Sequence, residues 1–434
     1  TWDDVILVLL REPRGAIARA VQDAKVPLRR VRDLLVAPAA RRAPPMSSPK
    51  PESRRARAAT RDEDDIPDAR PPERPRLTPP PRPEPPDRRR RWLGLLYLGV
   101  PVSGALMLLH AGPLPTFVVA VCAIPPLAGL IATATEHLAE RTGATVGAML
   151  NAAFGNATEI IVCIAALSAG YIELVKASIA GSVLSNLLLI LGVALISGGL
   201  RRPVLRFDRT AAGMGLGMLA LAVAALILPT FLRGTPGEHH LVGLSETVAV
   251  ILALTYVAWL VYVASSRRGV VPAPEPAAAG RARWPLPKVL GALAVATVLV
   301  AFESDLLVKS IGPVTRDLGV SEVFLGLIVV PIVGNAAEHV TAVIAAYHGR
   351  TDLAVQVAVG SSTQIALVVA PLLVFAGALL GAPMTLVFPE LEVLALAMAV
   401  IVTALIVVDG ESHWLEGVQL VALYGMIAAA AWFI

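Results

Sequence analysis

Most of the chain after Trp92 consists of long apolar runs separated by short polar breaks. A membrane-spanning helix needs about 20 mostly apolar residues, and the pattern predicts eleven such helices. Their expected ranges are 92–111, 115–135, 143–168, 173–198, 210–231, 242–265, 286–308, 320–347, 353–380, 384–408 and 415–434. The predicted fold class is therefore an all-α integral membrane protein. An apolar content of 56% supports this, because soluble domains contain less.

The residues before the first predicted helix have a different composition. Residues 47–91 are rich in Pro and Arg, and such a stretch buries too little apolar surface to fold. We therefore expect residues 1–91 to form a disordered tail. Met46 is the first methionine, and a translation start there, with residues 1–45 untranslated, stays open.

Basic residues predict the orientation of the chain. They cluster at Arg88–Arg91, in the loop after the fourth helix (Arg201, Arg202, Arg206 and Arg209), and in the loop after the sixth (Arg267, Arg268, Arg281, Arg283 and Lys288). With eleven helices all three clusters lie on one side, which should be the cytoplasm. The N-terminus is then cytoplasmic and the C-terminus outside. The net charge of +4 follows from these topology signals and does not indicate a nucleic-acid partner.

The apolar region contains an internal repeat. GNATE at 155–159 and GNAAE at 334–338 are 179 residues apart, and the pairs Gly181–Ser182 and Gly360–Ser361 have the same spacing. Each half holds five helices, an odd number, so the halves have opposite orientations, as in many secondary transporters. The expected organisation is an extra first helix (92–114), a first repeat (115–266), a basic linker (267–285) and a second repeat (286–434).

Glutamates inside the repeat are the strongest functional signal. Glu159 and Glu338 lie in the middle of apolar segments, where a charge is costly and usually marks an ion path. Asn156 and Asn335 precede them by three residues, so each amide shares a helix face with its carboxylate. A structural hydrogen bond between helices is the alternative for the glutamates, and interhelical bridging for the asparagines.

Further polar residues stand near these motifs. The fourth and ninth helices carry small polar side chains that either line the site or only pack helices together: Ser182, Ser185, Asn186, Ser361, Ser362 and Gln364. His339 follows Glu338 directly and either shuttles protons or supports packing. Glu136 lies at the cytoplasmic end of the second helix, and Glu303 lies well along the seventh, towards the far side. They either admit and release the ion, one at each face, or are simply solvated. Glu390 and Glu392 open the tenth helix and are interpreted as helix-start charges.

The ligand set favours a hard cation. Calcium takes six to eight oxygen ligands from carboxylates, carbonyls, amides and water, and Glu159 and Glu338 are the predicted metal ligands. The two cysteines lie inside apolar runs and offer no cluster for a softer metal. Burial and a nearby like charge both favour the protonated form of a carboxylate. We therefore expect protons and the cation to compete for the two glutamates, and this competition to couple their movements.

At these motifs the sequence resembles the calcium/proton exchanger (CAX) family of the cation/calcium exchanger superfamily. The matching stretches are LNAAFGNATEIIV at 150–162, SIAGSVLSNLLLILG at 178–192, VVPIVGNAAEHVTAV at 329–343 and VGSSTQIAL at 359–367. The resemblance covers residues 92–434. It implies an eleven-helix antiporter of Ca²⁺ and H⁺, with central carboxylates at Glu159 and Glu338 and gating carboxylates at Glu136 and Glu303. The basic linker departs from the acidic stretch of many members.

Other readings remain. The coupling ion can instead be Na⁺ or K⁺, and a membrane-embedded hydrolase is a remote alternative, because the chain has no HExxH motif or nucleophile–base pair. We expect no enzyme activity and no cofactor, with Ca²⁺ as transported substrate. The expected partners are Ca²⁺, H⁺ and the lipid bilayer, with a homo-oligomer left open. The expected location is a bacterial cytoplasmic membrane.

Overall fold

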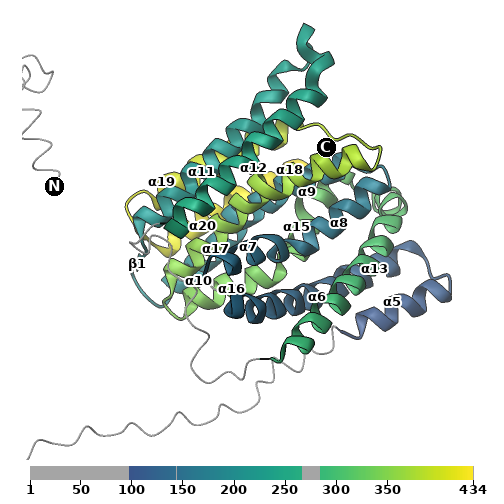
Figure 1. The fold of residues 1–434 in the computed structure, drawn as a ribbon, viewed down its shortest axis with the longest axis horizontal. Coiled ribbons are helices and arrows are strands. Elements are labelled where there is room, and N and C mark those ends of the chain that lie inside the picture. The colour runs from purple at the N-terminus through teal and green to yellow at the C-terminus, as the bar shows by residue number, and fades with distance from the viewer. Residues whose placement is uncertain (1–96, 143, 266–283, 434) are drawn as a thin grey trace, which may run out of the picture. The chain divides into compact units, whose positions relative to one another are not determined.

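A computed structural model of the chain describes residues 97–142, 144–265 and 284–433. The predicted disordered tail, the question of the translation start and nearly all of the basic linker therefore lie outside the described residues. Within those residues the fold is almost entirely helical, as predicted (Figure 1).

The first half begins with the extra helix α5 (Gly99–Leu108) and continues with the helices of the first predicted repeat. These are α6 (Pro113–Thr142), α7 (Ala144–Gly155), α8 (Ala157–Ser168), α9 (Ile172–Leu184), α10 (Leu191–Gly199), α11 (Arg209–Ile227) and α12 (Leu241–Ser265). Short segments of other helix types join them: the π-helical η1 (Ser185–Ile190) and the 3₁₀ turns η2 (Leu228–Leu232) and η3 (Pro236–His240).

The second half has the same kind of order. Its α-helices are α13 (Leu286–Leu318), α14 (Glu322–Phe324), α15 (Val330–Gly334), α16 (Ala336–Tyr347), α17 (Thr351–Gln364), α18 (Ala370–Leu379), α19 (Glu390–Val407) and α20 (Trp414–Trp432). Two π-helical segments, η4 (Leu325–Val329) and η5 (Ile365–Val369), lie between them.

Eight helices in the described residues are long and apolar enough to cross a membrane, and two bent pairs bring the number to ten. The extra helix α5 has only 10 residues there, so the count of eleven stays a prediction. Three boundaries differ clearly from those expected. Helix α6 runs on to Thr142, past the predicted end at 135. Helix α13 runs on to Leu318, past the predicted end at 308, and Gly319 ends it with a φ of 66°. Helix α19 begins only at Glu390, because Gly381 (φ 73°), Pro383 and Pro389 interrupt the chain before it.

The two halves break their helices at matching residues. The third predicted span bends by 46° at Asn156, and the eighth bends by 62° at Asn335. Both asparagines have backbone angles near the bridge region, with φ −101° and ψ 18° for Asn156 and φ −87° and ψ 10° for Asn335. The π-helical segments η1 and η5 are also one repeat spacing apart. The structure therefore repeats the local distortions of the backbone as well as the sequence motifs.

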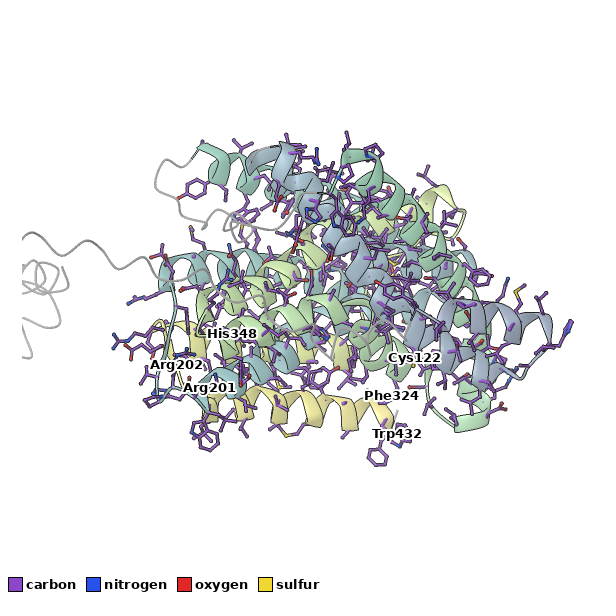
Figure 2. The ribbon with its side chains drawn as sticks, turned by 90° about the horizontal axis from the view of Figure 1, so that it is seen from below. Cys122, Arg201, Arg202, Phe324, His348 and Trp432 are labelled. Atoms are coloured by element: carbon purple, nitrogen blue, oxygen red, sulfur yellow. The ribbon has the colours of Figure 1, made fainter. Side chains whose placement is uncertain are left out.

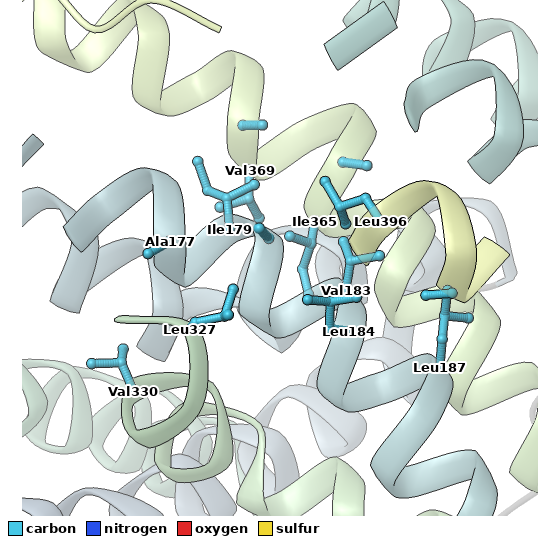
Figure 3. Close-up of a cluster of buried hydrophobic side chains, with 14 of the residues drawn as sticks. Ala177, Ile179, Val183, Leu184, Leu187, Leu327, Val330, Ile365, Val369 and Leu396 are labelled. Carbon is cyan, nitrogen blue, oxygen red and sulfur yellow. The ribbon is translucent and has the colours of Figure 1, made fainter. Parts of the chain in front are cut away.

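Close packing holds the two halves together. A Cβ on Gly181 of α9 would stand 2.2 Å from the carbonyl oxygen of Leu327 in η4, and one on Gly326 would stand 2.7 Å from that of Leu174. Small residues allow such an approach between membrane helices. Around this crossing, apolar side chains from α9, η1, η4, η5 and α19 form the buried core shown in Figure 3.

Three loops meet at one end of the bundle. Strand β1 (Leu205–Arg206) pairs antiparallel with β2 (Glu411–Ser412), and Arg206 Nε lies 3.0 Å from Glu411 Oε1. Arg201 stacks over the ring of Tyr347 at 4.0 Å. Figure 2 shows Arg201 and Arg202 beside His348, away from the Phe324–Trp432 contact at the other end of α20. The loops after the predicted fourth, eighth and tenth helices thus share one side, as the predicted topology requires. Which face of the membrane this side meets stays a prediction.

Candidate functional site

The two helix breaks place the two predicted central glutamates. Glu159 is the third residue of α8 and is buried, with 4% of its surface exposed. Glu338 is the third residue of α16 and is half-buried. The carbonyl oxygens of Asn156 and Asn335 accept the first helical hydrogen bonds of these helices, each at 3.0 Å. Each carboxylate therefore lies in the first turn of a helix that starts inside the bundle, where the helix dipole favours a negative charge.

The two carboxylates come from different halves and approach the same place. A Cβ on Gly334 would lie 3.3 Å from Glu159 Oε1, and Glu338, which follows across the break at Asn335, is close enough for its charge to act on Glu159. The missing side chain at Gly334 makes the space that the carboxylate of Glu159 occupies. The break at Asn335 thus lets the first half insert a carboxylate against the second.

A chain of hydrogen bonds reaches Glu338 from the first half. Asn186 Nδ2 donates to Ser361 Oγ at 3.0 Å, and Ser361 Oγ donates to Glu338 Oε2 at 2.6 Å. Asn186 lies in η1 and Ser361 in α17, so this chain connects the predicted fourth, ninth and eighth spans. Ser361 fixes the direction of one carboxylate oxygen.

The asparagines of the two motifs also bridge the halves. Asn156 Nδ2 donates to Gln364 Oε1 at 2.8 Å, and Asn335 Nδ2 donates to Ser182 Oγ at 3.3 Å. Tyr256 of α12 also lies near Gln364. In this conformation the two asparagines bridge helices, which is the alternative role considered for them from the sequence. They also stay within three residues of the glutamates in the chain.

Not every predicted site residue joins this network. Ser185 and Ser362 donate to backbone carbonyls, mainly of their own helices. His339 follows Glu338, and its Nε2 is buried with no hydrogen-bond partner among the described residues. Glu136 is exposed near the end of α6. Glu303 is fully buried in α13 and accepts a hydrogen bond from Ser103 of α5.

Two residues that lie beside the predicted site residues were not predicted from the sequence. Tyr256 and Ser103 lie in apolar helices and belong to no repeated motif. Their partners, Gln364 and Glu303, are distant in the chain, so nothing in the local sequence announces the contacts.

The sequence profile of a known family matches both halves of the chain. The family is described as sodium/calcium exchanger protein, and the match covers residues 113–264 and 288–433.

The chain belongs to this exchanger family.

Individual relatives agree with this membership. The "Ca(2+)/H(+) antiporter" of Aphanothece halophytica is 40% identical, over 78% of this chain and 95% of the relative. The "Vacuolar calcium ion transporter" of Schizosaccharomyces pombe is 42% identical, over 73% of this chain and 79% of the relative. The solved structure of native YfkE superimposes with a TM-score of 0.70 at 35% identity, covering 79% of this chain and all of that one.

The candidate site is a set of oxygen atoms. Among the described residues no group of three or more His, Cys, Asp or Glu side chains is arranged to hold a metal ion. The polar centre instead combines two carboxylates with amide and hydroxyl oxygens. Glu159 Oε2 and Asn335 Oδ1 are buried and have no hydrogen-bond partner among those residues. Buried oxygens that lack donors are suited to a hard cation such as Ca²⁺ or to a proton.

Proposed function

We propose that this exchanger is a secondary active antiporter that moves Ca²⁺ in exchange for H⁺ by alternating access. The names of the two relatives at 40% and 42% identity support these ions. One observation carries the proposal: Glu159 from the first half lies against Gly334 of the second half, close enough to Glu338 for the two carboxyl groups to influence each other. Two carboxylates at the meeting point of two inverted halves form a site that both faces of the membrane can reach in turn.

The proposed coupling is competition for the same oxygens. Two neighbouring carboxylates repel each other while both are charged, and a divalent cation or protons relieve this repulsion. The switch between the two faces then proceeds only with a neutralised pair. Asn156 and Asn335 contribute amide oxygens to the cation once their present bridges across the halves rearrange.

Other predicted residues keep supporting roles in the proposal. Ser361 orients Glu338, Asn186 orients Ser361, and Ser182 and Gln364 hold the asparagines of the motifs. Glu136, exposed near the end of α6, collects the cation at one face. Ser185, Ser362 and His339 support the packing around the centre.

We further propose that the exchanger lies in a bacterial cytoplasmic membrane, with its N-terminus in the cytoplasm. The basic loops that follow the fourth and sixth predicted helices support this orientation. The similar proteins include a vacuolar transporter, so a vacuolar membrane is the competing location.

The test is transport by the purified protein in liposomes. Calcium uptake should need an outward-directed proton gradient, proceed without Na⁺ or K⁺, and vanish in Glu159→Gln and in Glu338→Gln. Glu322→Gln is a matched control, because Glu322 also lies in the first turn of its helix, α14, but outside the site. If uptake requires Na⁺ or K⁺, that ion and not H⁺ is the coupling ion. Normal uptake in either site variant would refute the proposed site.

A further inference from the structure

A second buried carboxyl group lies away from the central pair. Glu303 of α13 and Ser103 of α5 are both fully buried, and Ser103 Oγ is 2.5 Å from Glu303 Oε1. The other carboxyl oxygen, Oε2, has no hydrogen-bond partner among the described residues. This contact connects the extra helix, which has no counterpart in the repeat, with the first helix of the second half.

The extra helix is held in position for this contact. Tyr97 Oη donates to the carbonyl oxygen of Pro126 in α6 at 2.9 Å. Gly99 packs so closely on α6 that a Cβ there would stand 2.9 Å from Cβ of Ala123. Of the ten residues of α5, all of them described, only Ser103 is buried. Figure 1 shows α5 beside α6 and α13. The helix thus presents a single hydroxyl to the interior.

No positively charged side chain pairs with Glu303 in the part of the chain that the structure describes. The nearby Lys309 is paired with Asp305 at 2.6 Å. Helix α5 contains no charged residue. A charged carboxylate without a partner is costly at this depth, whereas a neutral carboxylic acid needs only hydrogen-bonding groups. The place suits a proton better than a divalent cation.

The hydroxyl of Ser103 has more acceptors than hydrogens. It lies 3.0 Å from the carbonyl oxygens of both Gly99 and Val100, as well as 2.5 Å from Glu303 Oε1. A serine has one hydrogen to donate and lone pairs to accept. When Glu303 is a carboxylate, Ser103 can donate to it. When Glu303 carries a proton, the acid can donate to Ser103 Oγ while Ser103 donates to its own helix. Both protonation states of Glu303 are therefore hydrogen-bonded.

We infer that Glu303 and Ser103 form a proton-carrying pair separate from the cation site, in which the extra helix supplies the positioning residue Ser103. In the step, an O–H bond of a hydronium ion breaks and an O–H bond to a Glu303 carboxylate oxygen forms, and the reverse transfer later returns the proton to water. As part of proton-coupled exchange, this role rests on the proposed function. It also reassigns Glu303 from a gate for the cation to a carrier of a proton.

The first test is infrared spectroscopy, which does not depend on transport. In the full-length exchanger, the spectrum of the wild type minus that of Glu303→Gln should contain the carbonyl stretch of a protonated carboxyl group. Ser103→Ala should shift this band to higher wavenumber, because the acid loses its acceptor. Ser304→Ala should not, although Ser304 is equally buried and adjacent, because its hydroxyl donates to Val300 of its own helix at 2.7 Å. The difference between Ser103→Ala and the wild type needs no Glu303 variant, so a poorly folded Glu303→Gln would not prevent the test.

The second test is calcium uptake in the same liposomes. Ser103→Ala should slow proton-driven uptake roughly three- to tenfold, the effect of one lost buried hydrogen bond. Ser103→Thr should restore most of the rate, since it returns the hydroxyl, and Ser304→Ala should match the wild type. An unshifted carboxyl band in Ser103→Ala, or equal rates in the Ala and Thr variants, would overturn the inference. A wild type that moves no calcium would refute the proposed function, while the infrared result would still decide on the pair.

Discussion

Oε1 of Glu159 lies 3.3 Å from the point where a Cβ on Gly334 would stand. A methyl group there would press on the carboxylate and displace it by a few tenths of an ångström. Gly334→Ala should therefore weaken calcium transport by roughly tenfold or more, since small misplacements at a site have large effects. The measurement is initial uptake in liposomes, together with a thermal melt to show that the variant is folded.

The repeat supplies a control for this prediction. Gly155 is the residue that corresponds to Gly334 in the first half, but a Cβ there would lie 3.8 Å from its closest neighbour, Asn151 Oδ1. This is an ordinary van der Waals contact, so Gly155→Ala should transport nearly as well as the wild type. Similar losses in both variants would contradict the arrangement in which the carboxylate of Glu159 occupies the space at Gly334.

A second pair of glycines, Gly181 and Gly360, should behave unequally for a different reason. A Cβ on Gly181 would stand 2.2 Å from the carbonyl oxygen of Leu327, whereas one on Gly360 would have nothing within 4 Å. Gly181→Ala forces two backbones apart, at a cost of at least the ~1–3 kcal/mol typical of overpacking. It should therefore melt at a clearly lower temperature in detergent, and Gly360→Ala should melt like the wild type. Equal melting temperatures would show that the crossing of α9 and η4 is looser than described.

The repeat could be predicted from the sequence because its signals are local. A glutamate inside an apolar run is costly and indicates a functional site. GNATE and GNAAE, which are separated by the repeat spacing, identify both helix breaks. The structure places Asn156 and Asn335 at those breaks. The span ranges were also mostly right, because apolar length is a direct requirement of the membrane.

The contacts could not be predicted, because the repeat is imperfect where the site is built. Asn335 donates to Ser182, but Asn156 donates to Gln364, which corresponds to Ser185 and not to Ser182 in the other half. Glu392 shows a second limit. The sequence indicates a residue near the start of a helix, but it does not give the direction of its side chain. The structure places Glu392 in the first turn of α19, as expected, but also buries its side chain completely.

Ser361 should matter more than its neighbour Ser362. Both are buried, but Ser361 donates to Glu338 at 2.6 Å, whereas Ser362 donates to the backbone of its own helix at 2.8 Å. Hydrogen bonds to charged groups are the stronger ones, so Ser361→Ala should lower calcium transport by roughly ten- to a hundredfold. Ser362→Ala should lower it less than about threefold. Uptake rates measured against calcium concentration decide this, and equal losses would remove Ser361 from the site.

Lys176 should stabilise the fold through a buried carboxyl group that no repeat motif includes. Its ammonium lies 3.1 Å from Glu173, and it is 7% exposed. Glu173 and Lys176 are also the charged neighbours of Glu392, which is 0% exposed and whose two carboxyl oxygens have no hydrogen-bond partner among the described residues. Lys176→Met removes the positive charge and leaves Glu392 beside Glu173 alone. No ion pair joins Lys176 to Glu392 among the described residues, so the variant loses a longer-range attraction and should melt modestly below the wild type.

Two further variants separate this effect from a general loss of lysine. Adding Glu392→Gln to Lys176→Met should restore part of the lost melting temperature, because it removes the uncompensated charge. Lys309→Met is the matched control: Lys309 pairs with Asp305 at 2.6 Å, but both side chains are more than half exposed, and such pairs contribute about 1 kcal/mol or less. If Lys176→Met and Lys309→Met shift the melting temperature equally, or if Glu392→Gln restores nothing, Lys176 does not compensate Glu392. A restored melting temperature would instead identify a charge interaction between Lys176 of α9, which also carries Ser182 of the candidate site, and Glu392 of α19.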